Sequence, residues 1–176
     1  RGMAACTSVF KVLDQKTEKD TGTQTLVKSN GVLELKNVNF RYGENTSESD
    51  KLALNNVSFK ANQGETIALV GRSGSGKSTT ISLLLRFYDV SSGEILIDDI
   101  NIEDLKRDSL RKQFAYVSQH VVLFNDTMAN NIAYGKPDAT RDEIIAAAKS
   151  AHVLEFAEHL PNGLETIIGE NGAMLS

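Results

Sequence analysis

The stretch that decides the fold is Gly71-Arg72-Ser73-Gly74-Ser75-Gly76-Lys77-Ser78-Thr79. An apolar run at residues 66–70 precedes it, and the apolar-rich residues 81–87 follow it. This order predicts a strand, a glycine-rich turn and a helix. The spacing G-x-x-x-x-G-K-[ST] is typical of a loop that binds nucleotide phosphates. A glycine-rich turn that contains Lys and Ser by chance would not need a strand and a helix on its two sides.

Each kind of residue in this loop has a physical task. Glycines allow backbone angles and close approaches that a Cβ atom would block. The backbone N–H groups from about Gly74 to Thr79 can then converge on phosphate oxygens, where the helix dipole also favours an anion. The motif assigns Lys77 to the β- and γ-phosphates and the hydroxyl of Ser78 to Mg²⁺.

Composition narrows the class of protein. The chain has 176 residues, of which 40% are apolar and 24% charged, which suits one globular domain with a buried core. A net charge of −4 and the lack of a Lys/Arg block argue against a nucleic-acid partner. No apolar stretch reaches membrane-spanning length, and the start at Arg1 lacks the layout of a signal peptide. The single cysteine, Cys6, excludes an internal disulfide and fits a reducing compartment.

The N-terminal residues predict two segments ahead of the folded domain. Apolar residues recur at helical spacing between positions 3 and 13, which predicts an amphipathic helix. This helix could pack on its own domain or extend from an upstream one. Residues 14–30 are rich in Lys, Glu, Asp, Thr, Gly and Ser, which predicts a polar linker. We expect the folded domain to begin near Gly31.

Alternating apolar residues predict two strands after Gly31. They cover residues 33–42 and 52–59, and in each the alternation slips by one position, which indicates a β-bulge. Residues 66–70 are apolar throughout, as in a parallel strand covered by helices. We therefore expect an α/β fold of the P-loop NTPase type, a mixed sheet with an antiparallel β subdomain on its N-terminal side.

Two further segments bear on metal binding. Residues 94–99 are an apolar run that ends in Asp98-Asp99. One interpretation is the strand of a nucleotide hydrolase whose terminal carboxylate holds Mg²⁺. The segment follows the phosphate-loop helix too closely for a crossover to a neighbouring parallel strand, so we interpret it as a tight turn between two short strands. Residues 114–118 predict another strand, and Gln119 just past its end could reach Mg²⁺ or a water near the γ-phosphate. An ordinary loop glutamine is the alternative.

Helical patterns dominate the second half of the chain. A short charged helix is predicted over residues 104–112, and others over 126–134, from the capping-box pattern at 140–143 onward, and around 153–160. His152 and His159 have no ligand partner at useful spacing, so we interpret them as ordinary helix residues. A helical subdomain is expected from about residue 120 to 176.

Together these pieces resemble the nucleotide-binding domain of an ABC transporter over residues 31–176. Tyr42 matches the aromatic residue that stacks on adenine in this family, and Gln119 matches the Q-loop glutamine that binds Mg²⁺. Residues 166–172 resemble the exporter-type loop ahead of the signature motif LSGGQ, and Leu175-Ser176 match its first two letters. The resemblance implies an incomplete P-loop domain of ABC type with ATP and Mg²⁺ as ligands. It implies that Lys77 and Gln119 take part in catalysis and that Ser78 and Gln119 bind the metal ion. The residues that it implies for nucleotide binding are Tyr42, residues 71–79, Gln119 and Ser176.

Residues 123–127, 130–134 and 168–176 more narrowly resemble the lipid A exporters of Gram-negative bacteria. In those proteins a transmembrane domain precedes the ATPase domain, so residues 1–13 would form the cytoplasmic end of its last helix. The resemblance implies ATP-driven lipid export at the cytoplasmic face of the inner membrane. It also implies a homodimer in which Ser176 faces the γ-phosphate bound by the second ATP-binding domain.

The family's remaining catalytic residues are absent from the sequence. The Gly-Gly-Gln of the signature, the Asp strand with its catalytic Glu, the D-loop and the switch His are not found, so we expect no normal turnover by this chain alone. Two other functions stay open: a soluble ABC-type ATPase of DNA repair or chromosome structure, and a nucleotide-binding module that never hydrolyses. The acidic balance, the exporter-like loop at 166–172 and the apolar N-terminal helix count against the first.

Overall fold

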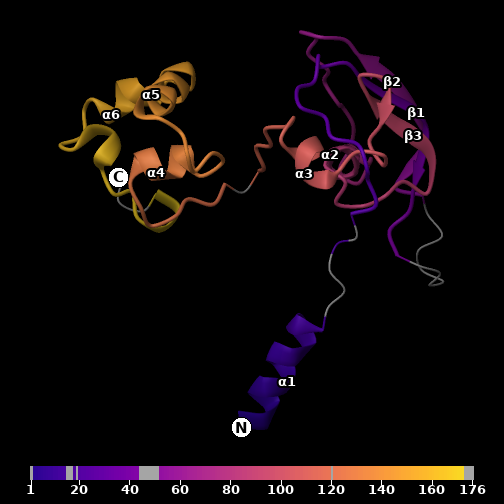
Figure 1. The fold of residues 1–176 in the computed structure, drawn as a ribbon, viewed down its shortest axis with the longest axis horizontal. Helices are drawn as coiled ribbons and strands as arrows, with labels where there is room; N and C mark the ends of the chain where they lie inside the picture. The colour runs from indigo at the N-terminus through magenta and orange to yellow at the C-terminus, as the bar shows by residue number, and fades with distance from the viewer. Residues whose placement is uncertain (1, 15–17, 19, 44–51, 120, 173–176) are drawn as a thin grey trace. The chain divides into compact units, whose positions relative to one another are not determined.

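The computed structural model describes residues 2–14, 18, 20–43, 52–119 and 121–172. The chain divides into two compact units, residues 1–115 and residues 116–176, which we call the N-terminal and C-terminal units (Figure 1). The N-terminal unit contains the sheet and the glycine-rich loop, and the C-terminal unit is helical.

An antiparallel sheet forms the centre of the N-terminal unit. Its strands are β1 (Leu33–Phe40), β2 (Leu54–Ala61), β3 (Ser92–Ile97) and β4 (Ile100–Asn101), in the spatial order β2-β1-β3-β4. The predicted bulges are confirmed, because the pairing of β1 with β2 shifts register between Leu35 and Val38. Asn37 and Asn56 carry positive φ angles of 50° and 52° at these irregularities. Asparagine tolerates this left-handed conformation better than most residues.

The predicted turn at Asp98-Asp99 is also confirmed. Both residues have positive φ, 51° and 65°, and they join β3 to β4 in an antiparallel hairpin. The Asp98 carboxylate accepts hydrogen bonds from the backbone N–H groups of Asn30, at 2.7 Å, and Val32, at 3.1 Å. Burial alone would raise the pKa of Asp98, but the hydrogen bonds from residues 29–32 outweigh it and lower that pKa. Asp98 therefore fixes the entry of the chain into the sheet.

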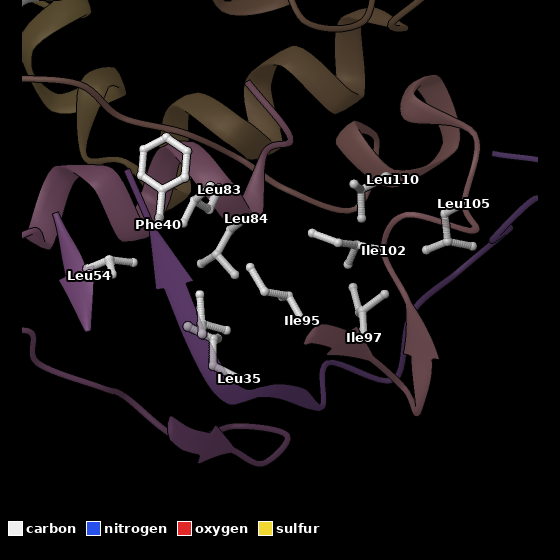
Figure 2. Packing of buried hydrophobic residues seen from close by; sticks show 11 residues of the cluster. Leu35, Phe40, Leu54, Leu83, Leu84, Ile95, Ile97, Ile102, Leu105 and Leu110 are labelled. Atoms are coloured by element: carbon white, nitrogen blue, oxygen red, sulfur yellow. The ribbon is translucent and has the colours of Figure 1, made fainter. Parts of the chain in front are cut away.

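A helix covers one face of this sheet and completes the core (Figure 2). Helix α2 (Lys77–Leu84) buries Leu83 and Leu84 against Leu35 and Ile95. The shorter α3 (Arg107–Arg111) adds Leu110 to the same cluster. The core therefore fixes α2, whose first residues belong to the glycine-rich stretch.

The prediction of strands at residues 66–70 and 114–118 is wrong. Neither segment pairs with a strand in the part of the chain that the structure describes. Phe114 packs partly buried against the core, but most of the other apolar side chains of the two segments are exposed. Val70 is 90% exposed and Val117 is 84% exposed. A parallel strand exists only where neighbouring strands accept and donate its ladder hydrogen bonds. Of the expected mixed sheet, the residues that the structure describes form only the antiparallel part.

Residue 18 and residues 20–30 differ from a free polar linker, because they dock along residues 102–113. A parallel bridge joins Gln24 to Leu105, and the N–H of Lys106 donates to the Gln24 carbonyl at 2.8 Å. At Gly22 the approach is so close that a Cβ atom would lie 1.9 Å from the Leu105 carbonyl oxygen. The linker prediction came from a lack of apolar periodicity, whereas the docking uses backbone and polar groups together with one apolar side chain, Leu26, which packs against the core.

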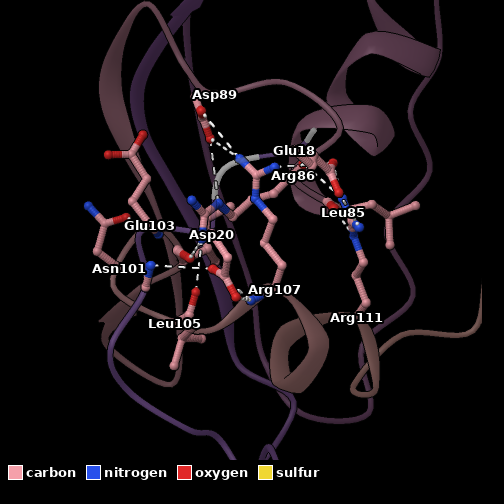
Figure 3. A network of polar contacts seen from close by, with 12 residues as sticks. Glu18, Asp20, Leu85, Arg86, Asp89, Asn101, Glu103, Leu105, Arg107 and Arg111 are labelled. Atoms are coloured by element: carbon pink, nitrogen blue, oxygen red, sulfur yellow. Dashed lines mark hydrogen bonds and ion pairs between the residues drawn. The ribbon is translucent and has the colours of Figure 1, made fainter. Parts of the chain in front are cut away.

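Charged side chains add a second set of contacts to the docked segment (Figure 3). The Glu18 carboxylate accepts two hydrogen bonds from Arg111, at 2.6 and 2.9 Å, and lies 3.2 Å from the guanidinium of Arg107. Arg111 also donates to the carbonyls of Leu85, at 2.9 Å, and Arg86, at 3.0 Å. The segment before the sheet is thus linked to the end of α2.

The C-terminal unit is built from α4 (Met128–Ala133), α5 (Arg141–Ser150) and α6 (Val153–Ala157), with 3₁₀ turns η1 (Gly163–Glu165) and η2 (Glu170–Gly172). The predicted capping box is confirmed: Thr140 accepts from the Glu143 N–H, and the Glu143 carboxylate accepts from the Thr140 N–H. The buried side chains of this unit are Met128, Ala129, Ala148, Ala157, Leu164 and Ile168.

The sequence also made predictions about the N-terminal helix and about two histidines. Helix α1 (Gly2–Leu13) forms where the spacing predicts it, and Phe10, Val12 and Leu13 on it are exposed. Within the described residues no helix combines the length and the apolar character needed to cross a membrane. His152 and His159 belong to no cluster of metal-ligating side chains among the residues described.

Candidate functional site

The glycine-rich loop takes the backbone shape that its glycines were predicted to allow. Gly74 and Gly76 have φ angles of 78° and 89°. Gly76 is the N-cap of α2, and a Cβ atom there would lie 2.5 Å from Leu54 Cδ2 and 2.6 Å from the Ala53 carbonyl oxygen. The loop therefore passes directly over the start of β2, and only glycine fits at position 76.

The start of α2 leaves a row of backbone donors without partners inside the helix. The first helical hydrogen bond runs from the Thr80 N–H to the Gly76 carbonyl at 2.8 Å. The amides from Gly76 to Thr79 precede it and have no acceptor within the helix. Together with the positive end of the helix dipole, these donors favour an anion at this point.

Lys77 adds a full positive charge beside these donors. Its ammonium group donates to the carbonyls of Gly71, at 2.8 Å, and Arg72, at 2.9 Å, and contacts the Ser75 hydroxyl at 3.4 Å. These partners are all neutral, and no carboxylate pairs with Lys77 among the described residues. The lysine charge is therefore available to a phosphate, and the residues present fit a nucleotide tail.

The structure brings Tyr42 to this loop from the end of β1. The Tyr42 hydroxyl lies 3.0 Å from the Thr79 hydroxyl, so the two side chains share a hydrogen bond. Thr79 is buried on α2, whereas Tyr42 is 43% exposed. Tyr42 is thus a partly exposed aromatic side chain that is hydrogen-bonded to the end of the phosphate loop.

The two predicted metal ligands, Ser78 and Gln119, belong to different units of the chain. Ser78 is exposed at the start of α2, where its hydroxyl oxygen suits a hard cation such as Mg²⁺. Gln119 is exposed and belongs to the C-terminal unit, so its role at the metal stays a prediction. Ser176 and the rest of the expected signature start, residues 173–176, lie outside the described residues.

Two aromatic residues beside the site were missed by the sequence reasoning. The ring centroids of Phe40 and Tyr88 lie 4.7 Å and 5.1 Å from that of Tyr42. Phe40 was recognised only as a strand residue, and Tyr88 was not singled out. The sequence did contain a hint of this cluster. Two aromatic residues, Phe87 and Tyr88, directly follow the phosphate-loop helix, at a place where a loop normally carries polar residues.

Comparisons with known proteins agree with this geometry. Residues 54–176 match a protein family described as ABC transporter. The chain is 63% identical to "ATP-dependent lipid A-core flippase 1" of Colwellia psychrerythraea and 58% identical to "ATP-dependent lipid A-core flippase" of Pseudoalteromonas atlantica. Each alignment covers 100% of this chain and 30% of the relative.

A solved structure gives the same result at the level of the fold. The chain is similar to "Structure of a bacterial Atm1-family ABC exporter with ATP bound", with a TM-score of 0.84 and 39% identity. The match covers 99% of this chain and 30% of that one. The chain thus spans about a third of the length of the proteins that it matches.

Proposed function

The chain belongs to the ABC transporter family, and on this basis we propose that it binds ATP and, in the complete protein, powers lipid export by ATP hydrolysis. The observation that carries the proposal is the glycine-rich loop at the start of α2. There, unpaired amides and the Lys77 ammonium, which bonds only neutral acceptors, lie beside one another.

The proposed roles of the binding residues rest on the family resemblance and are supported at the loop by its geometry. The amides of residues 74–79 and Lys77 would hold the triphosphate. Tyr42 would stack on adenine, an interaction worth about 1–3 kcal/mol if base–aromatic stacking on nucleic acids is a guide. Ser78 and Gln119 would hold Mg²⁺, which when bound neutralises charge on the phosphoryl group being transferred.

The proposed partners come from the resemblance to exporters of the ABC family. Two copies of the domain would close head to tail over two ATP molecules in a homodimer, with Ser176 facing the γ-phosphate bound by the other copy. ATP would then bind between the domains and shift the transporter between conformations. Residues 1–13 would be the cytoplasmic end of a helix from a transmembrane domain, at the cytoplasmic face of the inner membrane.

Lipid A is the proposed substrate class because the most similar relatives reported above are named lipid A-core flippases. The same names count against a soluble ATPase of DNA repair. The chain by itself carries no residue that we assign as general base. Binding of ATP without turnover is therefore the behaviour proposed for it alone.

The test of nucleotide binding is the substitution Lys77→Ala, followed by calorimetric titration with Mg²⁺ and ATP. Loss of charge-assisted hydrogen bonds to phosphate should weaken affinity about tenfold to a hundredfold. The matched control is Lys112→Ala, which removes an exposed lysine from the same unit and should leave affinity unchanged. Equal ATP affinity in the Lys77→Ala variant and the original protein would refute the assigned role.

A further inference from the structure

We propose that Tyr88 is a positioning residue for base recognition: it holds the ring of Tyr42 in the orientation that adenine stacking requires. The inference rests on the proposed function, in which Tyr42 stacks on the base. It assigns to Tyr88 an effect on affinity for the base and none on affinity for the triphosphate.

Three aromatic rings form one cluster beside the phosphate loop. The Tyr42 ring meets Phe40 at an interplanar angle of 84° and Tyr88 at 87°, with centroids 4.7 and 5.1 Å apart. Phe40 and Tyr88 also touch, with centroids 5.5 Å apart. Perpendicular rings attract because the positive edge of one faces the negative face of the other, so these contacts favour one orientation of Tyr42.

The hydroxyl end of Tyr42 is held as well. It lies 3.0 Å from the hydroxyl of Thr79, which is buried in the first turn of α2. The ring contacts and this hydrogen bond act at different points of the side chain, so together they restrict its rotation. Because Tyr42 remains 43% exposed, part of it is still open to a ligand.

The chain reversal after α2 explains how Tyr88 returns to this cluster. Arg86 takes a left-handed φ of 50°, the N–H of Phe87 donates to the Ser82 carbonyl at 2.9 Å, and the helix ends. The buried Arg86 guanidinium donates to the carbonyls of Ile102, at 3.0 Å, and Leu105, at 2.9 Å, which fixes the reversal. One short helix thus carries the phosphate-binding amides at its start and the positioning ring just past its end.

Tyr88 can be tested without removing a core residue. Phe40 is only 4% exposed and packs in the core that Figure 2 shows, whereas Tyr88 is 48% exposed. Replacing Tyr88 should therefore change the freedom of the Tyr42 ring while the sheet and α2 stay folded. Thermal unfolding of each variant checks this point.

The experiment compares ATP with inorganic tripolyphosphate as probes, each titrated with Mg²⁺ into the original protein and into Tyr88→Leu. We expect Tyr88→Leu to bind ATP about two- to tenfold more weakly, the range of one ring–ring contact. Its affinity for tripolyphosphate should be unchanged, a difference that general destabilisation would not produce. Tyr88→Phe keeps the ring and should restore ATP affinity. Tyr134→Leu, which removes an exposed tyrosine from the C-terminal unit, should change neither affinity.

The outcomes separate this inference from the function on which it rests. If the original protein binds both probes and Tyr88→Leu binds ATP equally well, or loses both probes alike, the role of Tyr88 is overturned. If the original protein binds neither probe, the proposed function itself fails. Should Tyr88→Leu not fold, NMR of the original protein decides: contacts between the Tyr42 and Tyr88 rings should persist when ATP is added. Their loss would contradict the inference.

Discussion

At the scale of single residues, Arg86 shows how a strained position can be stabilised by buried polar contacts. Glycine is the usual residue where a helix ends in the left-handed conformation, and a side chain there costs about 1 kcal/mol. Arg86 is 1% exposed, donates to two carbonyls and lies 3.5 Å from Asp89 through its Nε atom. These contacts hold the guanidinium in place and offset the cost of the conformation.

Gly76 and Gly74 offer a matched pair of substitutions in the phosphate loop. Both have left-handed φ angles, but a Cβ atom at position 74 meets nothing within 4 Å, whereas at position 76 it meets Leu54 and the Ala53 backbone. We expect Gly76→Ala to lower the free energy of unfolding by about 3 kcal/mol and Gly74→Ala by about 1 kcal/mol. Chemical denaturation without nucleotide measures both, and equal losses would show that the contact with β2 is unimportant.

At the scale of elements, Glu18 should make the docked N-terminal segment sensitive to acid. The hydrogen bonds from Arg111 hold the pKa of Glu18 below its usual range. A lowered folded-state pKa stabilises the folded state above the unfolded value of about 4.3, and the benefit is lost as pH falls through the folded value. Glu18→Gln should therefore destabilise the protein at pH 7 and have little effect near pH 3.

The size of this effect is limited because the Glu18 side chain is 48% exposed, so water screens the pair. We expect a difference of about 1 kcal/mol or less at pH 7, measured by denaturation at both pH values. Glu103→Gln is the control, because Glu103 is an exposed glutamate of the same unit with no ion pair among the described residues. A pH-independent difference for Glu18→Gln would contradict the role of the Arg111 pair.

The elements that sequence could predict are those fixed by nearby residues. The bulge at Asn37, the Asp98-Asp99 turn and the capping box at Thr140 depend on contacts a few residues away or on one strand pair, and all three were predicted correctly. Residues 66–70 were misread as a strand because strand formation also requires a neighbour, which no local pattern reports. The docking of residue 18 and residues 20–30 leaves no periodic pattern in the sequence, because it uses backbone, polar and charged groups and only Leu26 packs against the core.

At the scale of the whole molecule, the phosphate loop and Tyr42 could be predicted as a site, but their mutual arrangement could not. The loop follows a local motif, and Tyr42 was identified only through its resemblance to a family. That Tyr42 lies against Thr79, and that Phe40 and Tyr88 surround it, depends on how α2 packs on the sheet. Partners that depend on tertiary packing leave little trace in sequence spacing.

The proposed function requires that the backbone amides at the start of α2 bind the phosphates of a nucleotide. The most direct measurement is the change in backbone amide NMR signals of ¹⁵N-labelled protein as Mg²⁺ and ATP are added. We predict that the largest shifts fall on residues 74–79 and that Lys77→Ala strongly reduces them. ATP binding that leaves these amides unshifted, with the changes elsewhere in the protein, would contradict the account.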